Sequence, residues 1–158
     1  MTARVVSDCM VFLQGAARSA GPARACFEIV DQGLVTLCVS PEVLAEVRDV
    51  LSRPELVKRF PALSAEWVTA FVTSVADKAL VVPDVPNAFV LPRDPKDEPY
   101  INLAVATQAE FLVSRDRDLL DLMTDAEFRR RFPALKIVDP ETFLRTIRSS
   151  QESPPATG

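Results

Sequence analysis

The chain has 158 residues, 48% hydrophobic and 25% charged, with a formal net charge of −4 at pH 7 and a pI of about 4.9. This length suits one domain with its own core, and no apolar run approaches the roughly 20 residues needed to cross a bilayer. Because the chain contains no histidine, the usual Ser-His-Asp and Cys-His hydrolases and histidine-based metal sites are excluded, which leaves carboxylates, hydroxyls, lysines and hard metal ions for hydrolytic chemistry.

The first half of the chain alternates short apolar segments with helical ones. Val5-Val6 predicts a buried strand that ends at Ser7-Asp8. The following segments are predicted as a helix over 22–32, a strand over 37–39, a helix beginning at 40–41, a short helix over 54–60, a helix over 64–76 and a strand over 79–82. Pro22 suits a first helical turn, Gly33 suits the position after a helix, and Ser40 followed by Pro41 is a favourable helix start.

In the second half, five prolines between 83 and 99 predict a loop. It precedes an almost wholly apolar helix over 100–109, a strand over 111–114, a short helix over 117–122, a helix over 124–132, a strand over 136–138 and a helix over 140–147 capped by Asp139. Apolar strands alternating with helices predict an α/β fold with a mainly parallel sheet of about five strands. We therefore expect one domain over 1–147 and a disordered tail over 148–158, and, since no signal-peptide pattern is apparent, a cytoplasmic location.

Acidic residues lie where the functional sites of parallel sheets are found, beyond the carboxyl ends of the strands. Asp8 follows the first strand, and Asp116 lies two residues past the fourth. Asp97 and Glu98 precede the apolar helix, and Glu46 lies at the edge of the buried face of the helix after the second strand. Carboxylates that converge repel one another, and a divalent cation relieves the repulsion. An all-oxygen ligand set favours Mg²⁺ or Mn²⁺.

Each acid also has a structural explanation. Asp8 and Asp116 could be helix caps, Glu46 could be a solvated helix residue, and Asp97 with Glu98 could complement a helix dipole. The net negative charge argues against a nucleic-acid partner unless bound cations reverse the local field. Spacing alone leaves a carboxylate metal site and a set of ordinary caps equally open.

The order of four segments resembles the PIN domain, in the branch described as toxin components of type II toxin–antitoxin pairs. The segments are residues 5–8, 40–47, 93–104 and 112–120, and the last two are the most specific. The resemblance spans about residues 3–147. It implies a three-layer α/β/α sandwich with a mainly parallel sheet.

By position, Asp8, Glu46, Glu98 and Asp116 resemble the family's four catalytic and metal-binding acids, with Asp97 as an adjacent substitute for Glu98. Ser114 matches a residue that supports the site by hydrogen bonding, and Asp118 matches an assisting acid. Arg115 and Arg117 are candidates for contact with RNA phosphates. The resemblance implies Mg²⁺- or Mn²⁺-dependent endonuclease activity on single-stranded RNA that leaves 5′-phosphate and 3′-hydroxyl ends. It also implies an antitoxin partner and a homodimer.

Two positions depart from the family's pattern. Met10 stands where asparagine is usual, and a methionine side chain cannot donate the hydrogen bonds of an amide. Glu98 stands where aspartate is commoner. Met10 favours an alternative in which a PIN-like scaffold with weakened catalysis binds RNA or a protein. A third interpretation, an aspartyl phosphotransferase or receiver-like domain with Asp8 as nucleophile, lacks a second Asp two residues after Asp8 and an assignable strand-end lysine.

Overall fold

The computed structural model describes residues 2–92 and 94–152. Five strands form one parallel sheet in the order β3-β2-β1-β4-β5. The strands are β1 (Ala3–Ser7), β2 (Val35–Val39), β3 (Leu80–Val81), β4 (Phe111–Val113) and β5 (Lys136–Val138). The chain moves from β1 toward β2 and β3, then returns to place β4 on the other side of β1. The crevice between the carboxyl ends of β1 and β4 is therefore the topological switch point, where ligands of open α/β sheets bind.

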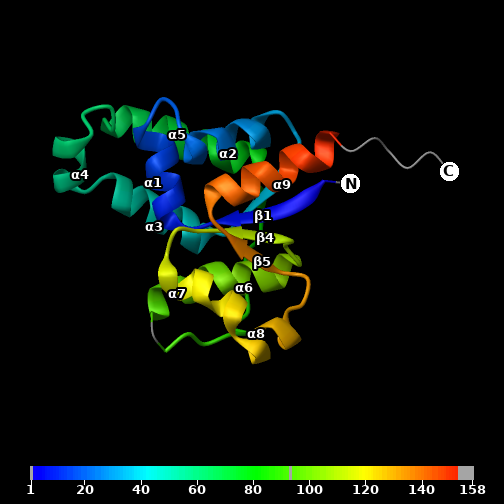
Figure 1. Ribbon diagram of the computed structural model, residues 1–158. Coiled ribbons are helices and arrows are strands. Elements are labelled where there is room, and N and C mark those ends of the chain that lie inside the picture. Colours follow the sequence, from blue (N-terminus) through cyan, green and yellow to red (C-terminus); the bar gives the residue numbers. More distant parts are fainter. Residues whose placement is uncertain (1, 93, 153–158) are drawn as a thin grey trace.

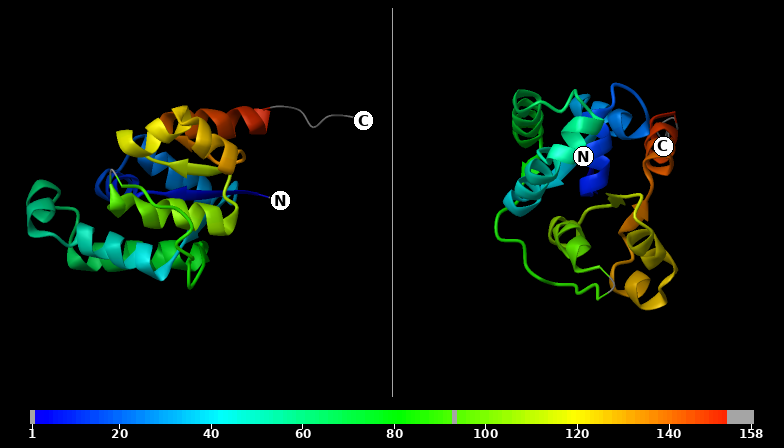
Figure 2. Two further views of the ribbon diagram at one scale, coloured as in Figure 1. Left: turned by 90° about the horizontal axis from the view of Figure 1, so that it is seen from below. Right: turned by 90° about the vertical axis from the view of Figure 1, so that its left-hand side faces the viewer.

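Helices cover both faces of the sheet, which confirms the predicted three-layer α/β architecture. One face carries α1 (Cys9–Ala17), α2 (Pro22–Asp31), α5 (Ala65–Lys78) and α9 (Pro140–Glu152), and the other carries α6 (Glu98–Thr107), α7 (Arg117–Leu120) and α8 (Ala126–Arg131) (Figures 1 and 2). Helix α3 (Pro41–Leu51) packs against α1, α5 and α6. The short helix α4 (Pro54–Arg59) and the 3-10 turns η1 (Pro95–Asp97) and η2 (Asp121–Thr124) complete the connections.

The core lies on both sides of the central strands, which are mostly apolar because both of their faces are covered. Val6, Val39 and Leu112 are fully buried. On one face the rings of Phe12 and Phe27 lie 5.1 Å apart and join α1 to α2. That approach requires Gly15, because a Cβ there would lie 2.4 Å from the Phe27 ring.

Local sequence signals account for most helix starts. The hydroxyls of Ser40 and Ser64 accept hydrogen bonds from the amides of Val43 and Trp67, both at 3.1 Å, and so cap α3 and α5. Asp139 caps α9 by accepting from the Thr142 amide at 2.7 Å. These caps lie where the sequence predicts them.

Three elements differ from expectation. Helix α1 occupies 9–17, where no helix was predicted, because its near-continuous apolar sequence has no helical period. Strand β3 is only Leu80–Val81 and is exposed at the sheet edge. Helix α9 continues to Glu152, so 148–152, expected in a disordered tail, are helical; 153–158 lie outside the described residues. No helix among the described residues is both long and apolar enough to span a membrane.

Candidate metal centre

Three helices begin at the crevice beyond β1 and β4, and an aspartate stands at the start of each. Asp8 ends the connection from β1 and caps α1, accepting a hydrogen bond from the Val11 amide at 2.9 Å. Asp116 follows β4 and caps α7, accepting from the Asp118 amide at 2.8 Å. Asp97 occupies the N-cap position of α6, but its side chain makes no capping bond. The cap explanation is thus correct for Asp8 and Asp116, and the same geometry directs both toward the crevice.

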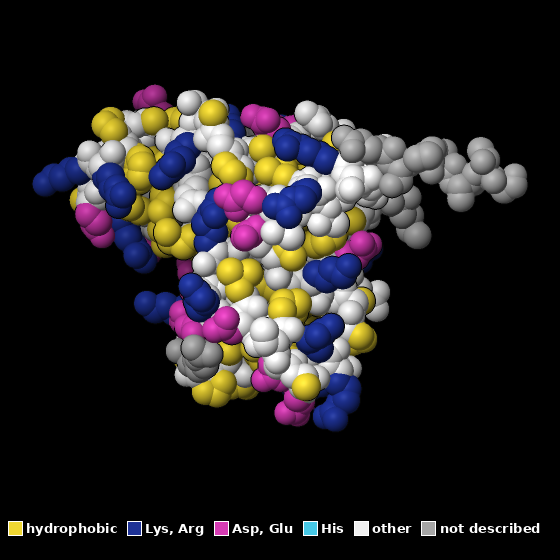
Figure 3. Space-filling model, in the orientation of Figure 1, with side chains coloured by type: hydrophobic (Ala, Val, Ile, Leu, Met, Phe, Trp, Pro, Cys, Tyr) yellow, Lys and Arg dark blue, Asp and Glu magenta, His cyan; other side chains and the backbone are white. Residues whose placement is uncertain are grey.

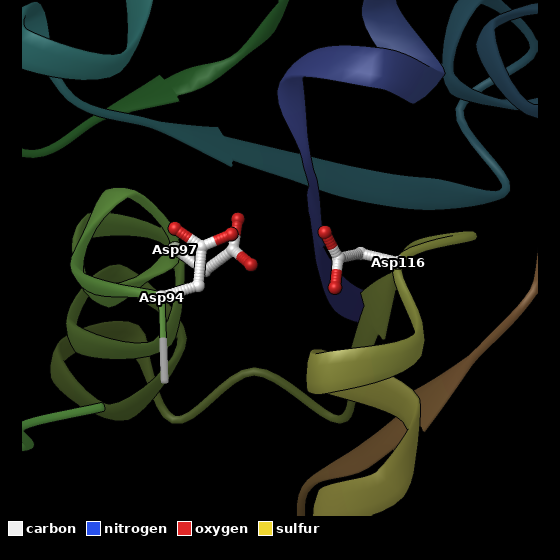
Figure 4. Close-up of side chains that lie close together, drawn as sticks. All are labelled: Asp94, Asp97 and Asp116. Carbon is white, nitrogen blue, oxygen red and sulfur yellow. The ribbon is translucent and has the colours of Figure 1, made fainter. Parts of the chain in front are cut away.

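Three carboxylates form a compact group across this crevice. Asp94, Asp97 and Asp116 each offer one oxygen, and these oxygens lie within 4.8 Å of one another. Asp94 and Asp97 lie side by side at the start of α6 and face Asp116 across the gap (Figure 4). Oxygen ligands lie about 2.0–2.6 Å from Mg²⁺ or Ca²⁺, so oxygens on opposite sides of such an ion are about 4–5 Å apart. The spacing and the donor chemistry both fit a hard divalent cation.

The carboxyl group of Asp97 is buried among other acids without full hydrogen bonding from the part of the chain that the structure describes. Its Oδ2 is buried and has no hydrogen-bond partner among the described residues. Burial, followed by the negative charges of Asp116, Asp94 and Asp8, raises the pKa of its carboxyl group to about 7. A buried carboxylate oxygen facing other carboxylates is costly unless a cation or a proton neutralises it.

Asp8 lies behind the group and is held rigidly. It is 3% exposed, and while Oδ1 accepts from Val11, Oδ2 accepts from the hydroxyl of Ser114. Burial raises the pKa of Asp8 to about 6, the two hydrogen bonds oppose this shift, and the charge of Asp116 adds to it. Asp8 lies outside the compact group but contributes to its field.

Ser114 is hydrogen-bonded both to Asp8, which follows β1, and to Asp116, which follows β4. Its side chain is fully buried, and its hydroxyl donates to Asp8 while accepting a hydrogen bond from the Asp116 amide at 2.9 Å. One hydroxyl therefore orients both carboxylate-bearing turns, which is the supporting geometry that the resemblance implies for this residue.

Glu46 lies on α3, half-buried and outside the compact group. Burial raises the pKa of the Cys9 thiol to about 11, and the charge of Glu46 adds to this shift. Burial also raises the pKa of Tyr100, with further contributions from charges at Cys9 and Glu46. These effects place Glu46 near Cys9, the residue after Asp8, on the α1 side of the crevice.

The two adjacent acids at the start of α6 point to different places. Oε1 of Glu98 accepts a hydrogen bond from the Leu91 amide at 2.9 Å, and its side chain lines a separate polar cavity. Asp97, not Glu98, belongs to the compact acid group. The resemblance gave Glu98 as the third acid and Asp97 as its adjacent substitute. Helix α6, predicted to start at Tyr100, starts at Glu98, which leaves Asp97 as the N-cap residue within the acid group.

Asp94 was not among the acids predicted from the sequence. It is followed by Pro95, the same pattern that marks the helix starts at Ser40-Pro41 and Asp139-Pro140, and its Oδ1 accepts from the Lys96 amide at 3.1 Å. An Asp-Pro pair three residues before a second acid was the available signal.

The two arginines predicted to contact phosphate differ in whether their guanidinium groups are already bound to other side chains of the described residues. The guanidinium of Arg115 donates to both carboxylate oxygens of Glu141, at 3.1 and 2.6 Å, and to Gln14 at 3.0 Å. Arg115 also lowers the pKa of Glu141 through this hydrogen bonding. Arg117 is exposed at the first position of α7, next to Asp116. Asp118 is half-buried in the same turn.

The fold and the acids together define a class: an open parallel α/β domain with a group of carboxylates at its switch point that could hold a divalent cation. Residues 4–118 match the sequence profile described as PIN domain. The chain belongs to the PIN domain family, whose members are generally nucleases that use a divalent metal. The matched region contains Asp8, Glu46, Asp94, Asp97 and Asp116.

A solved structure supports the fold. The crystal structure of PAE2754 from Pyrobaculum aerophilum aligns with a TM-score of 0.54 at 18% sequence identity, covering 94% of this chain and 90% of that one. At this identity the likeness extends to the fold alone. No curated protein matches the sequence.

Proposed function

We propose that this protein is a metal-dependent endoribonuclease that hydrolyses phosphodiester bonds of single-stranded RNA. The observation that carries the proposal is the group formed by Asp94, Asp97 and Asp116 at the switch point of a PIN-domain sheet. Three acids that gather around an oxygen that is buried and has no partner in the described part of the chain are poorly suited to a structural role, because their mutual repulsion opposes folding. They suit a site that gains its stability on binding Mg²⁺ or Mn²⁺.

Each residue has a defined part in this proposal. Asp97 and Asp116, with Asp94 beside them, hold the cation, which when bound supplies charge neutralisation and an acidified water for attack on phosphorus. Asp8 and Ser114 position the turn that carries Asp116, so they fix the ligand geometry. The resemblance also implied Asp8, Glu46 and Glu98 as ligands. The membership of Asp97 in the compact acid group supports Asp97 over Glu98, and we assign Asp8 and Glu46 no direct bond to the cation.

Basic side chains supply the counter-charge that an acidic chain needs to approach RNA. Arg117 is exposed on the residue after Asp116 and can contact a phosphate next to the cation. Arg115 can do so only by leaving Glu141. We therefore assign Arg117 the larger part in phosphate binding, with Asp118 supporting the turn.

Cleavage of a labelled single-stranded RNA in Mn²⁺ tests this function. We expect the wild-type protein to cut the RNA and leave 5′-phosphate ends, and EDTA to stop the reaction. Asp116→Asn and Asp97→Asn should each reduce the rate at least about a hundredfold, since both remove charge from the cation site. Asp77→Asn, an exposed change on α5, is the matched control. Cutting by Asp116→Asn at the wild-type rate would refute the assignment.

We also propose that the protein is the toxin of a toxin–antitoxin pair, acting on RNA in the cytoplasm. The support is the resemblance of residues 93–104 and 112–120 to that branch of the family. Expression of the wild type, but not of Asp116→Asn, should arrest growth, and co-expression of an adjacent small gene product should restore it. The resemblance also favours a homodimer, which sedimentation equilibrium tests directly.

One observation favours a second function, a catalytically weakened module that binds RNA or protein. Met10 is 50% exposed in the first turn of α1, two residues from Asp8, where the family usually has asparagine. An exposed apolar side chain beside the acids suits contact with a partner better than orientation of water. Calorimetric titration with Mn²⁺ separates the two functions, because a binding module need not retain a tight metal site.

A further inference from the structure

A second, polar cavity adjoins the acid group on the other side of the turn Pro95–Glu98. It has a volume of about 200 Å³. Its polar lining comes from three segments that are distant in sequence, namely the start of α3, the loop after β3 and the first half of α6: Ser40, Glu42, Asn87, Glu98 and Asn102. Asp94 and Asp97 alternate along this turn with Pro95 and Glu98, which line the cavity. An RNA bound at the acids therefore has this cavity within reach of a neighbouring nucleotide.

Asn102 forms a rigid, oriented part of this cavity. It is only 3% exposed, and its Oδ1 accepts hydrogen bonds from the amides of Ala88 and Phe89, at 3.0 and 2.8 Å. These two donors identify the oxygen and turn the Nδ2 amine the other way. Within the described part of the chain, no protein group accepts a hydrogen bond from that amine. The cavity thus contains a fixed donor available to a ligand.

The carboxylates of the cavity provide acceptors. Glu98 uses Oε1 to accept from the Leu91 amide, which holds the side chain in place and leaves Oε2 for another donor. Glu42 lies in the first turn of α3, close to the buried hydroxyl of Ser40. Two carboxylates repel phosphate, so the ligand is not an anion. They instead favour a neutral group with several N–H donors.

The smaller, apolar part of the lining comes from Val85, Pro95 and Pro99, against which the face of a planar ring can pack. Proteins read single-stranded RNA by hydrogen bonds to the Watson–Crick edge of a base that is splayed out of the stack.

We propose that this cavity binds one guanine of the RNA substrate next to the scissile phosphodiester; this inference rests on the proposed nuclease function. Guanine is the one standard base whose Watson–Crick edge carries two adjacent donors, N1–H and N2–H₂, beside an acceptor, O6. The N2 amine matches Oε2 of Glu98, N1–H matches the carboxylate of Glu42, and O6 matches the Nδ2 amine of Asn102. Adenine, cytosine and uracil each present fewer donors to the two carboxylates.

The test is cleavage of RNA made of adenine and uracil with one central guanine, compared with the same RNA carrying inosine, which lacks the N2 amine. With Mn²⁺, cuts should fall at a fixed distance from the guanine, and inosine should lower kcat/KM by about fivefold to tenfold, the loss expected for one hydrogen bond to a charged acceptor. In Glu98→Gln, which retains the acceptor for Leu91, the guanine-to-inosine ratio should fall close to one. Glu55→Gln on α4 should keep the wild-type ratio.

Each outcome has a distinct meaning. Cleavage without preference for guanine overturns this inference and leaves the nuclease function standing. An unchanged ratio in Glu98→Gln also overturns it, because the preference would then come from elsewhere. Loss of one bound Mn²⁺ in Glu98→Gln would identify the cavity as a cation site instead. No cleavage of any RNA overturns the inference together with the proposed function.

Discussion

Replacing Asp97 with asparagine should stabilise the protein when no metal is bound. The carboxylate of Asp97 faces three other acids, and its Oδ2 is buried with no hydrogen-bond partner among residues 2–92 and 94–152. Asparagine keeps the size of the side chain and removes the charge. The wild-type residue must either stay protonated or remain charged in an unfavourable field, and the variant avoids both.

The size of the effect follows from the pKa. A shift from 3.8 to about 7 is about three units, which corresponds to at most about 4 kcal/mol. Because the side chain is only half-buried, solvent screening reduces this to about 1–2 kcal/mol. The folded-state pKa lies above the unfolded one, so the stabilising proton is fully bound below about pH 4 and is lost as the pH rises through about 7. The advantage of the variant should therefore be largest at pH 8 and vanish near pH 4.

Urea unfolding in EDTA at pH 4, 6 and 8 measures this difference. Asp97→Asn should exceed the wild type by about 1–2 kcal/mol at pH 8, and Asp77→Asn, an exposed change on α5, should equal the wild type throughout. With Mn²⁺ added, the wild type should gain more stability than Asp97→Asn, because only the wild type retains the full acid group. A variant that is less stable than the wild type at pH 8 in EDTA would refute the repulsion on which the metal centre depends.

Further predictions concern the metal site and the sheet. Mn²⁺ affinity should rise between pH 5 and pH 8 and binding should release protons, because the pKa values of Asp8 and Asp97 are raised to about 6 and about 7; equal heats in buffers of different ionisation enthalpy would contradict this. Asp97→Asn should weaken Mn²⁺ binding more than Glu98→Gln, and calorimetry showing the reverse order would return the third ligand to Glu98. Ser114→Ala should lower the free energy of unfolding by about 1–3 kcal/mol, because the buried Asp8 loses its donor; chemical denaturation checks this, with the exposed Ser74→Ala as control. Leu112→Ala should cost about 3 kcal/mol by leaving a cavity in a fully buried strand, and Leu80→Ala at the 40% exposed edge should cost far less.

The parts of the site that follow strands could be predicted from the sequence. A buried apolar strand has a recognisable pattern. Asp8 comes directly after one such strand, and Asp116 lies three residues past Val113, the end of another, so the parallel topology brings both to one crevice. Ser114 was indicated by the family resemblance, and not by the strand pattern. The sheet covered on both faces could also be predicted, because its strands are apolar. The caps at Ser40 and Asp139 could be predicted because each is followed by a proline.

The acids at the start of α6 could not be assigned in this way. Glu98 and Asp97 are adjacent and differ by about 100° around a helix, so which of them faces the crevice depends on the path of the turn before α6, which the residue pattern does not determine. Asp94 enters the site through a proline-containing turn whose path depends on tertiary packing. Helix α1 was not predicted, because a helix that is buried on most sides lacks the periodic polar residues by which a helix is identified in a sequence.

The most direct test is anomalous diffraction at the manganese edge from crystals soaked in Mn²⁺. We expect a peak between the side chains of Asp94, Asp97 and Asp116, about 2.2 Å from at least one oxygen of each. A peak coordinated by Glu98 or Glu46 without Asp97, or no peak in this crevice, would contradict the proposed metal centre.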